Sequence, residues 1–200
     1  GAEIELVAAF NREHRLERAL EVVARDYDWI FLDCPPALGL LTVNALVAAT
    51  EVLVPIQCEY YALEGLGQLL SNIDLVRSHL NTSLHVSTIL LTMYDGRTKL
   101  ADQVTSEVRQ HFGPTALRTV IPRSVKVSEA PGYSQTVLAY DPGSRGAMSY
   151  IDAAREIAEE LGLDLARCAA YTDSITDLPL LEAVGQPSVV NPDRELRAIA

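Results

Sequence analysis

Lysine is almost missing from this 200-residue chain, which contains only Lys99 and Lys126. The scarcity matters because a loop that cradles nucleotide phosphates has the pattern Gly-x-x-x-x-Gly-Lys-Ser/Thr. In that loop backbone N–H groups approach the phosphates and the lysine neutralises them. Neither lysine follows a glycine, and the stretch "GLGQLL" lacks the third glycine of a dinucleotide-binding loop. The sequence as printed therefore holds no phosphate-cradling loop.

Cysteines and long apolar runs are also scarce. Cys34, Cys58 and Cys168 are far apart and form no CxxC pair, which indicates reduced thiols in a cytoplasmic protein rather than disulfides or a zinc site. No apolar run approaches the ~18–20 residues of a membrane span, and Gly1 starts no secretion signal. Because that first residue is not methionine, we expect a processed product or a fragment.

Positive charge is in deficit as well. The net charge is −11 and the sequence pI is about 4.7, which disfavours unspecific adhesion of the whole surface to nucleic acid or anionic lipid. Any DNA contact must therefore come from a few well-placed arginine or lysine side chains.

Hydrophobic residues make up 48% of the chain, enough for the core of one α/β domain with an appendage. Their periodicity alternates between strand and helix, which predicts a mostly parallel sheet covered by helices on both faces. The expected strands are 29–33, 51–57, 85–95 and 118–122, and the expected helices are 15–25, 39–50, 63–80, 99–112 and 147–161.

The run "WIFLD" (29–33) is expected to be a buried strand that delivers Asp33 to the edge of the sheet. Read alone, an acid in this position is more often a turn or cap residue. We expect Tyr60, Tyr61 and the leucine stripe of 63–80 to lie in the core, and Cys34 and Cys58 to be buried, inert thiols.

Four long blocks resemble the ParA/Soj family of deviant-Walker partitioning ATPases, which are P-loop NTPase-like. They are "YDWIFLDCPPALGLLTVNAL", "VPIQCEYYALEGLGQLL", "LLTMYDGRTKLADQVTSEVRQHFG" and "VIPRSVKVSEAPGYSQTVLAYDPGSRGAMSY". The resemblance extends from residue 1 to about residue 160 and lacks the family's P-loop strand. It implies that ATP and Mg are the cofactors of an intact member, with binding by this chain doubtful.

The resemblance also assigns residue roles. Asp33 would be the Walker B acid, which holds a magnesium-bound water beside the β- and γ-phosphates and so counts as both catalytic and metal-binding. The segment 34–39 would be the switch that senses the γ-phosphate, and two further residues would border the adenine. The implied nucleotide-binding residues are Cys34, Pro35, Gly39, Met93 and Pro122.

Three basic residues fall where the family binds DNA without sequence preference: Arg97, Arg123 and Lys126. Taken one by one, each is more often plain solvated surface. The implied partners are nucleoid DNA and a ParB-like centromere-binding protein, with a homodimer when nucleotide binds, and the implied location is cytoplasmic and nucleoid-associated.

The tail, "AAYTDSITDLPLLEAVGQPSVVNPDRELRAIA", resembles haloacid-dehalogenase-type phosphatases, whose Asp-Ser-x-x-Asp turn binds magnesium. Asp173 and Asp177 match that turn, and hard oxygen ligands suit magnesium. The nucleophile motif of that family and its phosphate-holding lysine are missing, so the phosphoaspartyl route cannot run.

These observations predict two parts, a truncated ParA-like ATPase domain over 1–161 and a phosphatase-like fragment over 162–200. We expect a partitioning ATPase without effective ATP hydrolysis; the alternatives are a non-catalytic DNA-binding module and a magnesium-dependent phosphatase fragment. Without the P-loop strand the sheet would contain a slot with unpaired backbone groups. The chain would then fold poorly or fill the slot with "CAAY" or "PSVV" from the tail.

Overall fold

The computed structural model describes residues 2–27, 29–35, 39–160, 162, 169–172, 186–189 and 197. The chain divides into two compact units. Unit 1 comprises residues Gly1–Val54 and Tyr60–Ile89, and unit 2 comprises Pro55–Glu59 and Leu90–Ala200. Two strands, β1 (Glu51–Gln57) and β2 (His85–Tyr94), pass from one unit into the other.

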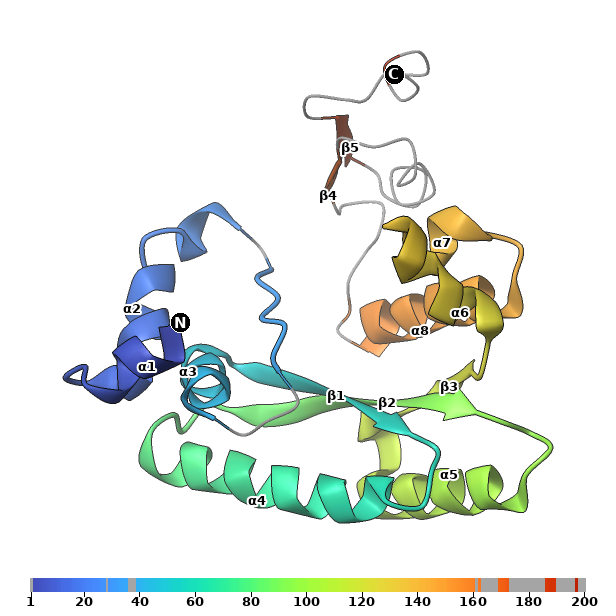
Figure 1. Ribbon diagram of the computed structural model, residues 1–200, viewed down its shortest axis with the longest axis horizontal. Coiled ribbons are helices and arrows are strands. Elements are labelled where there is room, and N and C mark those ends of the chain that lie inside the picture. The colour runs from blue at the N-terminus through green and yellow to red at the C-terminus, as the bar shows by residue number, and fades with distance from the viewer. Residues whose placement is uncertain are drawn as a thin grey trace. The chain divides into compact units, whose positions relative to one another are not determined.

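Three strands form one sheet in the order β1-β2-β3, with β3 at Ala116–Pro122. The sheet is parallel, because a helix carries the chain back between successive strands (Figure 1). The predicted strands at 51–57, 85–95 and 118–122 are therefore confirmed, as is the α/β class. A backbone bond from the Cys58 N–H to the Thr92 carbonyl, 2.9 Å long, continues the β1–β2 pairing just past the end of β1.

Unit 1 is built around helices that pack on the first halves of β1 and β2. Its core consists of Leu46, Val47, Ile73, Val76 and Leu84. The helical elements are α1 (Ala2–Val7), η1 (Arg12–His14), α2 (Arg15–Leu20), η2 (Ala24–Asp26), α3 (Leu40–Ala48) and α4 (Ala62–His79). The prediction for α4 is confirmed to within one residue, whereas the helix expected over 15–25 ends at Leu20.

Two asparagines join the elements of unit 1. The buried Asn44 on α3 donates from Nδ2 to the Arg12 carbonyl and accepts at Oδ1 from the Leu16 N–H, at 2.9 and 3.1 Å. Asn81, just after α4, donates to carbonyls in the last turn of α3 and to that of Ala49. The side-chain amides thereby form hydrogen bonds with backbone groups at the ends of these helices.

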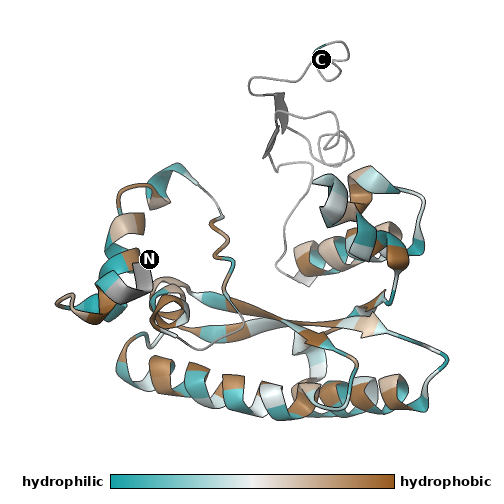
Figure 2. Cartoon of the chain, viewed as in Figure 1, coloured by the Kyte–Doolittle hydropathy of each residue, from teal (hydrophilic) through white to brown (hydrophobic). Residues whose placement is uncertain are grey.

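Unit 2 places helices on both faces of β3, with α5 and α8 on opposite sides in Figure 1. Its cores are centred on Leu117 and Ile121 of β3 and on Val137 and Ala147. The helical elements are α5 (Lys99–Phe112), η3 (Gly113–Thr115), α6 (Val125–Glu129), η4 (Ala130–Tyr133), α7 (Val137–Tyr140) and α8 (Arg145–Glu160). Hydrophobic and hydrophilic residues alternate along α4 and α5 (Figure 2), as the sequence periodicity predicts.

The outer edge of β3 is closed by a carboxylate instead of a strand. Glu156 of α8, 4% exposed, accepts the Arg118 N–H at 2.6 Å on Oε1 and the Thr119 N–H at 2.9 Å on Oε2. Two consecutive backbone donors are thus satisfied by one side chain, which ties α8 to the sheet.

The buried strand expected at 29–33 is wrong. These residues form no strand and are largely exposed, with Phe31 at 86% and Trp29 at 47%. A strand needs a neighbour to receive its backbone hydrogen bonds, and within the described part of the chain β1 pairs with β2 alone. An apolar sequence is therefore insufficient here to make a strand.

Several core predictions are also wrong. Tyr60 and Tyr61 are 72% and 77% exposed and contact each other edge to face, because they lie in the turn between β1 and α4 rather than on a face that packs. In the leucine stripe Leu66 is buried but Leu75 is exposed. Among the thiols Cys58 is buried, as predicted, and Cys34 is exposed.

The tail segments do not fill a slot in the main sheet. β4 (Ala169–Thr172) and β5 (Gln186–Val189) form a separate two-stranded parallel sheet, with Ala169 opposite Gln186. The prediction that "CAAY" and "PSVV" form strands is confirmed. The prediction that they pair with strands of the main sheet is wrong, because they pair with each other. The domain boundary expected at 161/162 stays a prediction. The two compact units divide the chain at other positions, and residues 161 and 162 both belong to unit 2.

Candidate functional site

The expected acidic site lies in unit 1, in the segment between η2 and α3. Asp33, Cys34 and Pro35 are exposed, and Gly39 is the residue that caps the start of α3, with its carbonyl accepting the Val43 N–H at 3.0 Å. Among the described residues Asp33 has no hydrogen-bond or ion-pair partner, so both of its carboxylate oxygens are free to bind an external ligand. This is the state that the proposed magnesium role requires.

Cys34 is the neighbour of that carboxylate. Atoms that partly shield the sulfur raise the pKa of the Cys34 thiol, and the Asp33 carboxylate raises it further. The thiol donates weakly to the Leu32 carbonyl at 3.5 Å. Cys34 is thus an accessible but protonated thiol and not an activated nucleophile.

The two residues expected to border an adenine come together in unit 2. The Arg123 N–H, just after β3, donates to the Tyr94 carbonyl at the end of β2 over 2.9 Å. This bond brings Met93 on β2 and Pro122 on β3 to the same carboxyl edge of the sheet. Met93 has a φ of +53°, a left-handed conformation that is uncommon for a residue with a long side chain.

Arg97 lies in the turn after β2 and is held by an acid two residues earlier. Its Nε donates to Asp95 Oδ1 at 2.8 Å and its Nη2 to Oδ2 at 2.7 Å, a two-pronged ion pair, and its backbone N–H adds a third bond. These contacts hold the pKa of Asp95 well below its usual range. Thr98 then caps α5 by accepting the Ala101 N–H.

Lys126 on α6 is also paired. Its Nζ donates to Glu129 Oε2 at 3.2 Å and lies 5.4 Å from the centre of the Tyr140 ring. The Tyr140 hydroxyl donates to the same oxygen at 3.1 Å, and its ring stacks on Tyr133. The hydrogen bond to Glu129 raises the pKa of Lys126, and the hydrogen bonds from Lys126 and Tyr140 lower the pKa of Glu129.

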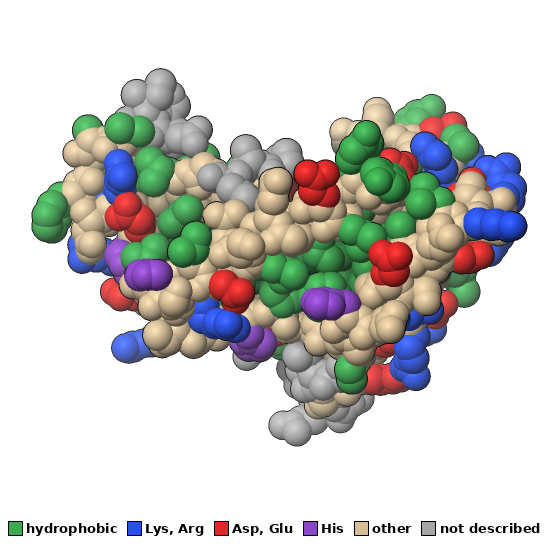
Figure 3. Space-filling view, turned by 90° about the horizontal axis from the view of Figure 1, so that it is seen from below, with side chains coloured by type: hydrophobic (Ala, Val, Ile, Leu, Met, Phe, Trp, Pro, Cys, Tyr) green, Lys and Arg blue, Asp and Glu red, His purple; other side chains and the backbone are tan. Residues whose placement is uncertain are grey.

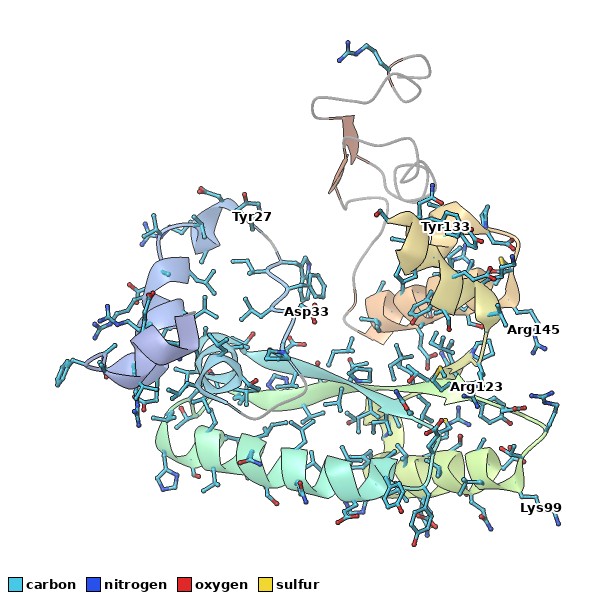
Figure 4. The ribbon with its side chains drawn as sticks, in the orientation of Figure 1. Tyr27, Asp33, Lys99, Arg123, Tyr133 and Arg145 are labelled. Carbon is cyan, nitrogen blue, oxygen red and sulfur yellow. The ribbon has the colours of Figure 1, made fainter. Side chains whose placement is uncertain are left out.

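Three further basic residues of unit 2 are exposed, and among the described residues none of them forms a hydrogen-bonded ion pair: Lys99, Arg123 and Arg145. The charge of Arg123 nevertheless acts on Asp95 and helps to lower the pKa of that carboxyl. Arg123 and Arg145 lie on the same side of unit 2 in Figure 4. Lys and Arg side chains gather at the right-hand end of the view in Figure 3, the end at which the turn after β2 lies. Sequence reasoning did not single out Arg145, because one arginine at the first position of a helix carries no local signal.

A shallow pocket of about 500 Å³ lies between α5 and β3. At its edge the Tyr94 hydroxyl donates to Asp102 at 2.6 Å, and Arg109 Nη2 donates to the Arg118 carbonyl at 2.6 Å. Its lining, which the sequence did not single out, consists of Tyr94, Asp102, Thr105, Ser106, Arg109, Arg118 and Val120.

The remaining expected ligands do not form a site. Asp173 and Asp177 lie outside the described residues. Within the described segments no three His, Cys, Asp or Glu side chains cluster to hold a metal ion.

Comparison with known proteins gives consistent matches. A family model described as an AAA domain matches residues 1–86. The chain is 56% identical over 158 residues to the sporulation initiation inhibitor protein Soj of Bacillus subtilis, a stretch that covers 79% of this chain and 62% of Soj. It is 52% identical over 157 residues to the chromosome partitioning protein ParA of Myxococcus xanthus, with 78% and 56% covered.

Among solved structures, cobyrinic acid a,c-diamide synthase from Mycobacterium smegmatis, with bound ADP and magnesium, matches with a TM-score of 0.65 and 34% identity. The match covers 81% of this chain and 59% of that enzyme. The chain thus spans less than two thirds of the length of the relatives it matches. None of these matches supports the phosphatase-like interpretation of the tail.

Within the described segments, each helix is too short or too polar to span a membrane.

Proposed function

Because this chain belongs to the ParA/Soj family of partitioning ATPases, we propose that it carries the Walker B acid, the γ-phosphate switch and the DNA-binding surface of such an ATPase. The observation that supports this most directly is the bond between the Arg123 N–H and the Tyr94 carbonyl. It places the two expected adenine neighbours at one sheet edge, with the basic residues immediately after them.

On the nucleotide side, Asp33 would hold a magnesium-bound water, and its unpartnered carboxylate fits that role. Bound magnesium would neutralise the charge of the β- and γ-phosphates. Gly39 and the switch residues Cys34 and Pro35 would contact the nucleotide, and Met93 and Pro122 would flank its base.

These 200 residues contain no lysine and glycine cradle for the triphosphate. We therefore expect the isolated polypeptide to release no phosphate from Mg-ATP above the buffer level. Steady phosphate release that disappears in Asp33→Ala would refute this expectation. The protein should be purified from a host that lacks partitioning ATPases of its own, so that no related enzyme contributes to the phosphate signal.

On the DNA side, the basic residues Arg97, Arg123 and Lys126 would contact phosphates without reading the bases. Such binding weakens as salt rises, because each phosphate contact releases counterions. The test is fluorescence anisotropy with a labelled duplex of arbitrary sequence at several salt concentrations.

The variant that combines Arg97→Gln, Arg123→Gln and Lys126→Gln should lose most of the binding. The control combines Arg77→Gln and Arg155→Gln, two arginines in exposed helix ion pairs, and should keep it. Absence of binding by the unaltered chain, or binding that ignores salt, would refute a DNA role.

The remaining family properties follow as proposals: nucleotide-dependent homodimerisation, a ParB-like partner and residence on the nucleoid. A DNA-binding module without catalysis is the second candidate, and the missing phosphate cradle favours it for the isolated polypeptide. Salt-sensitive DNA binding without nucleotide would support it.

A further inference from the structure

Charged side chains from two helices, α5 and α8, close the outer edge of β3. Within the described sheet β3 is the last strand, beside β2. We propose that Glu156 and Arg109 block this edge against strand pairing, and that removing them lets β3 pair with the same strand of a second copy of this chain. This block is independent of nucleotide and DNA binding.

The backbone N–H groups at the edge are held by Glu156 on α8. Its Oε1 accepts the Arg118 N–H at 2.6 Å, and its Oε2 accepts the Thr119 N–H at 2.9 Å. Glu156 is only 4% exposed, so another strand reaches these two donors only by displacing the carboxylate. Free N–H groups on an edge strand are the groups to which a second chain adds, and here both are already bonded.

The carbonyl groups at the same place are held from the other face of the sheet. Arg109 on α5 donates from Nη2 to the Arg118 carbonyl at 2.6 Å and, more weakly, to the Leu117 carbonyl at 3.4 Å. α5 and α8 lie on opposite sides of β3 (Figure 1). An acid on one helix and a base on the other thus bond the N–H and the C=O of the same residue, Arg118, as the backbone of a neighbouring strand would.

The choice of charged residues for this contact favours a blocking role. Burying a carboxylate costs free energy unless it is fully hydrogen-bonded. An apolar side chain at position 156 would avoid that cost but would leave the edge N–H groups open to another strand. The Arg118 side chain, 82% exposed, adds a positive charge at the same edge, with its Nε 3.1 Å from Glu156. Charged side chains on an edge strand oppose pairing, and like charges on two facing copies repel.

The partner that fits the unblocked edge is the same strand of a second copy. Thr119, Val120 and Ile121 are consecutive β-branched residues of β3, which favour a paired strand. When two copies meet antiparallel about a two-fold axis, the edge that is free on one is free on the other, and each strand supplies both donors and acceptors. The result would be one continuous sheet across two copies.

The experiment compares the unaltered chain with the double variant Arg109→Gln, Glu156→Gln by sedimentation velocity over a range of concentrations, without nucleotide. The variant loses one positive and one negative charge, so the net charge of −11 is unchanged and weaker general repulsion cannot explain association. We expect a reversible dimer whose dissociation constant is at least about tenfold lower than that of the unaltered chain, as two regained hydrogen bonds would give.

Two further variants separate edge pairing from mere loss of stability. Gly146→Ala strains unit 2 elsewhere, where its Cβ would lie 2.6 Å from Val127, and should stay monomeric. Adding Thr119→Pro to the double variant removes the N–H that Glu156 held, and proline prevents pairing at an edge, so the monomer should return. Circular dichroism checks that each variant is folded.

Amide exchange of residues 116–121 is a second measurement, which does not need the proline variant to fold. Exchange in this segment of the double variant should slow as its concentration rises, because pairing protects the freed N–H groups. A double variant that stays monomeric, or one whose exchange in this segment ignores concentration, would refute the block. So would equal association by Gly146→Ala, or an unaltered chain that already pairs through β3.

Discussion

Replacing Glu156 with glutamine is the sharpest test of how unit 2 is held together. Burial by itself would raise the pKa of Glu156, but hydrogen bonds from Arg118 and Thr119 outweigh it and lower the pKa from 4.5 to about 2. The shift corresponds to about 3 kcal/mol of preference for the ionised carboxylate in the folded state. A glutamine keeps the shape but offers one acceptor oxygen and turns an N–H₂ group toward a backbone N–H.

The sign of the pH dependence follows from the lowered pKa. The stabilisation is complete above the unfolded-state pKa of about 4.5 and is lost as the pH falls from there toward 2. We expect Glu156→Gln to lower the free energy of unfolding by about 2–3 kcal/mol at pH 7. The difference between the two proteins should shrink steadily below pH 4.5.

The measurement is urea unfolding followed by circular dichroism at pH 7, 5, 4 and 3. Glu159→Gln is the matched control, since its carboxylate is 74% exposed and 3.9 Å from Arg118, and it should cost less than about 0.5 kcal/mol. Equal losses in the two variants, or a difference that stays constant from pH 7 to pH 3, would refute the reasoning.

Other features give predictions of their own. Gly146→Ala should destabilise the protein by about 1–3 kcal/mol, because its Cβ would overlap Val127, whereas Gly143→Ala, with nothing within 4 Å of the added atom, should leave urea unfolding unchanged. Trp29, the single tryptophan, is 47% exposed, so its fluorescence should be red-shifted and readily quenched by acrylamide; a blue-shifted, protected signal would mean that 29–33 is a buried strand after all. Mass-mapped labelling with iodoacetamide above pH 9 should modify Cys34 well before the buried Cys58, and the reverse order would contradict the described exposures.

Local periodicity was sufficient for most elements of the fold. The amphipathic spacing of Leu100, Val104 and Val108 predicts α5 with its observed bounds. Val104 and Val108 are buried, whereas Leu100, in the first turn, stays 40% exposed. The strands at 51–57 and 85–95 are equally readable from their apolar runs. The residues 29–33 have the same composition, yet they form no strand, because strand formation depends on a partner that periodicity does not reveal.

The features of the candidate site also fall into two groups, those that the sequence led us to expect and those that only the structure revealed. Residue type and order, through the family resemblance, led us to expect roles for Asp33, Met93, Pro122 and the basic residues Arg97, Arg123 and Lys126. The resemblance could not show which of those basic residues are paired with acids, because the pairing depends on which carboxylates lie within hydrogen-bonding distance. Lys126 and Glu129 are one helical turn apart and their pairing could have been expected; the contact between α8 and the segment after β3 could not.

The sequence by itself therefore determined the strands β1, β2 and β3, the helices between them, the α/β class and the family resemblance, all of which depend on neighbours along the chain. The tertiary structure alone decided that Glu156 is buried against two backbone N–H groups, that Arg145 lies beside Arg123, and that Trp29 and Phe31 are exposed. Each of these depends on long-range packing, in which the free energy of a charge or an apolar group is set by what surrounds it in space.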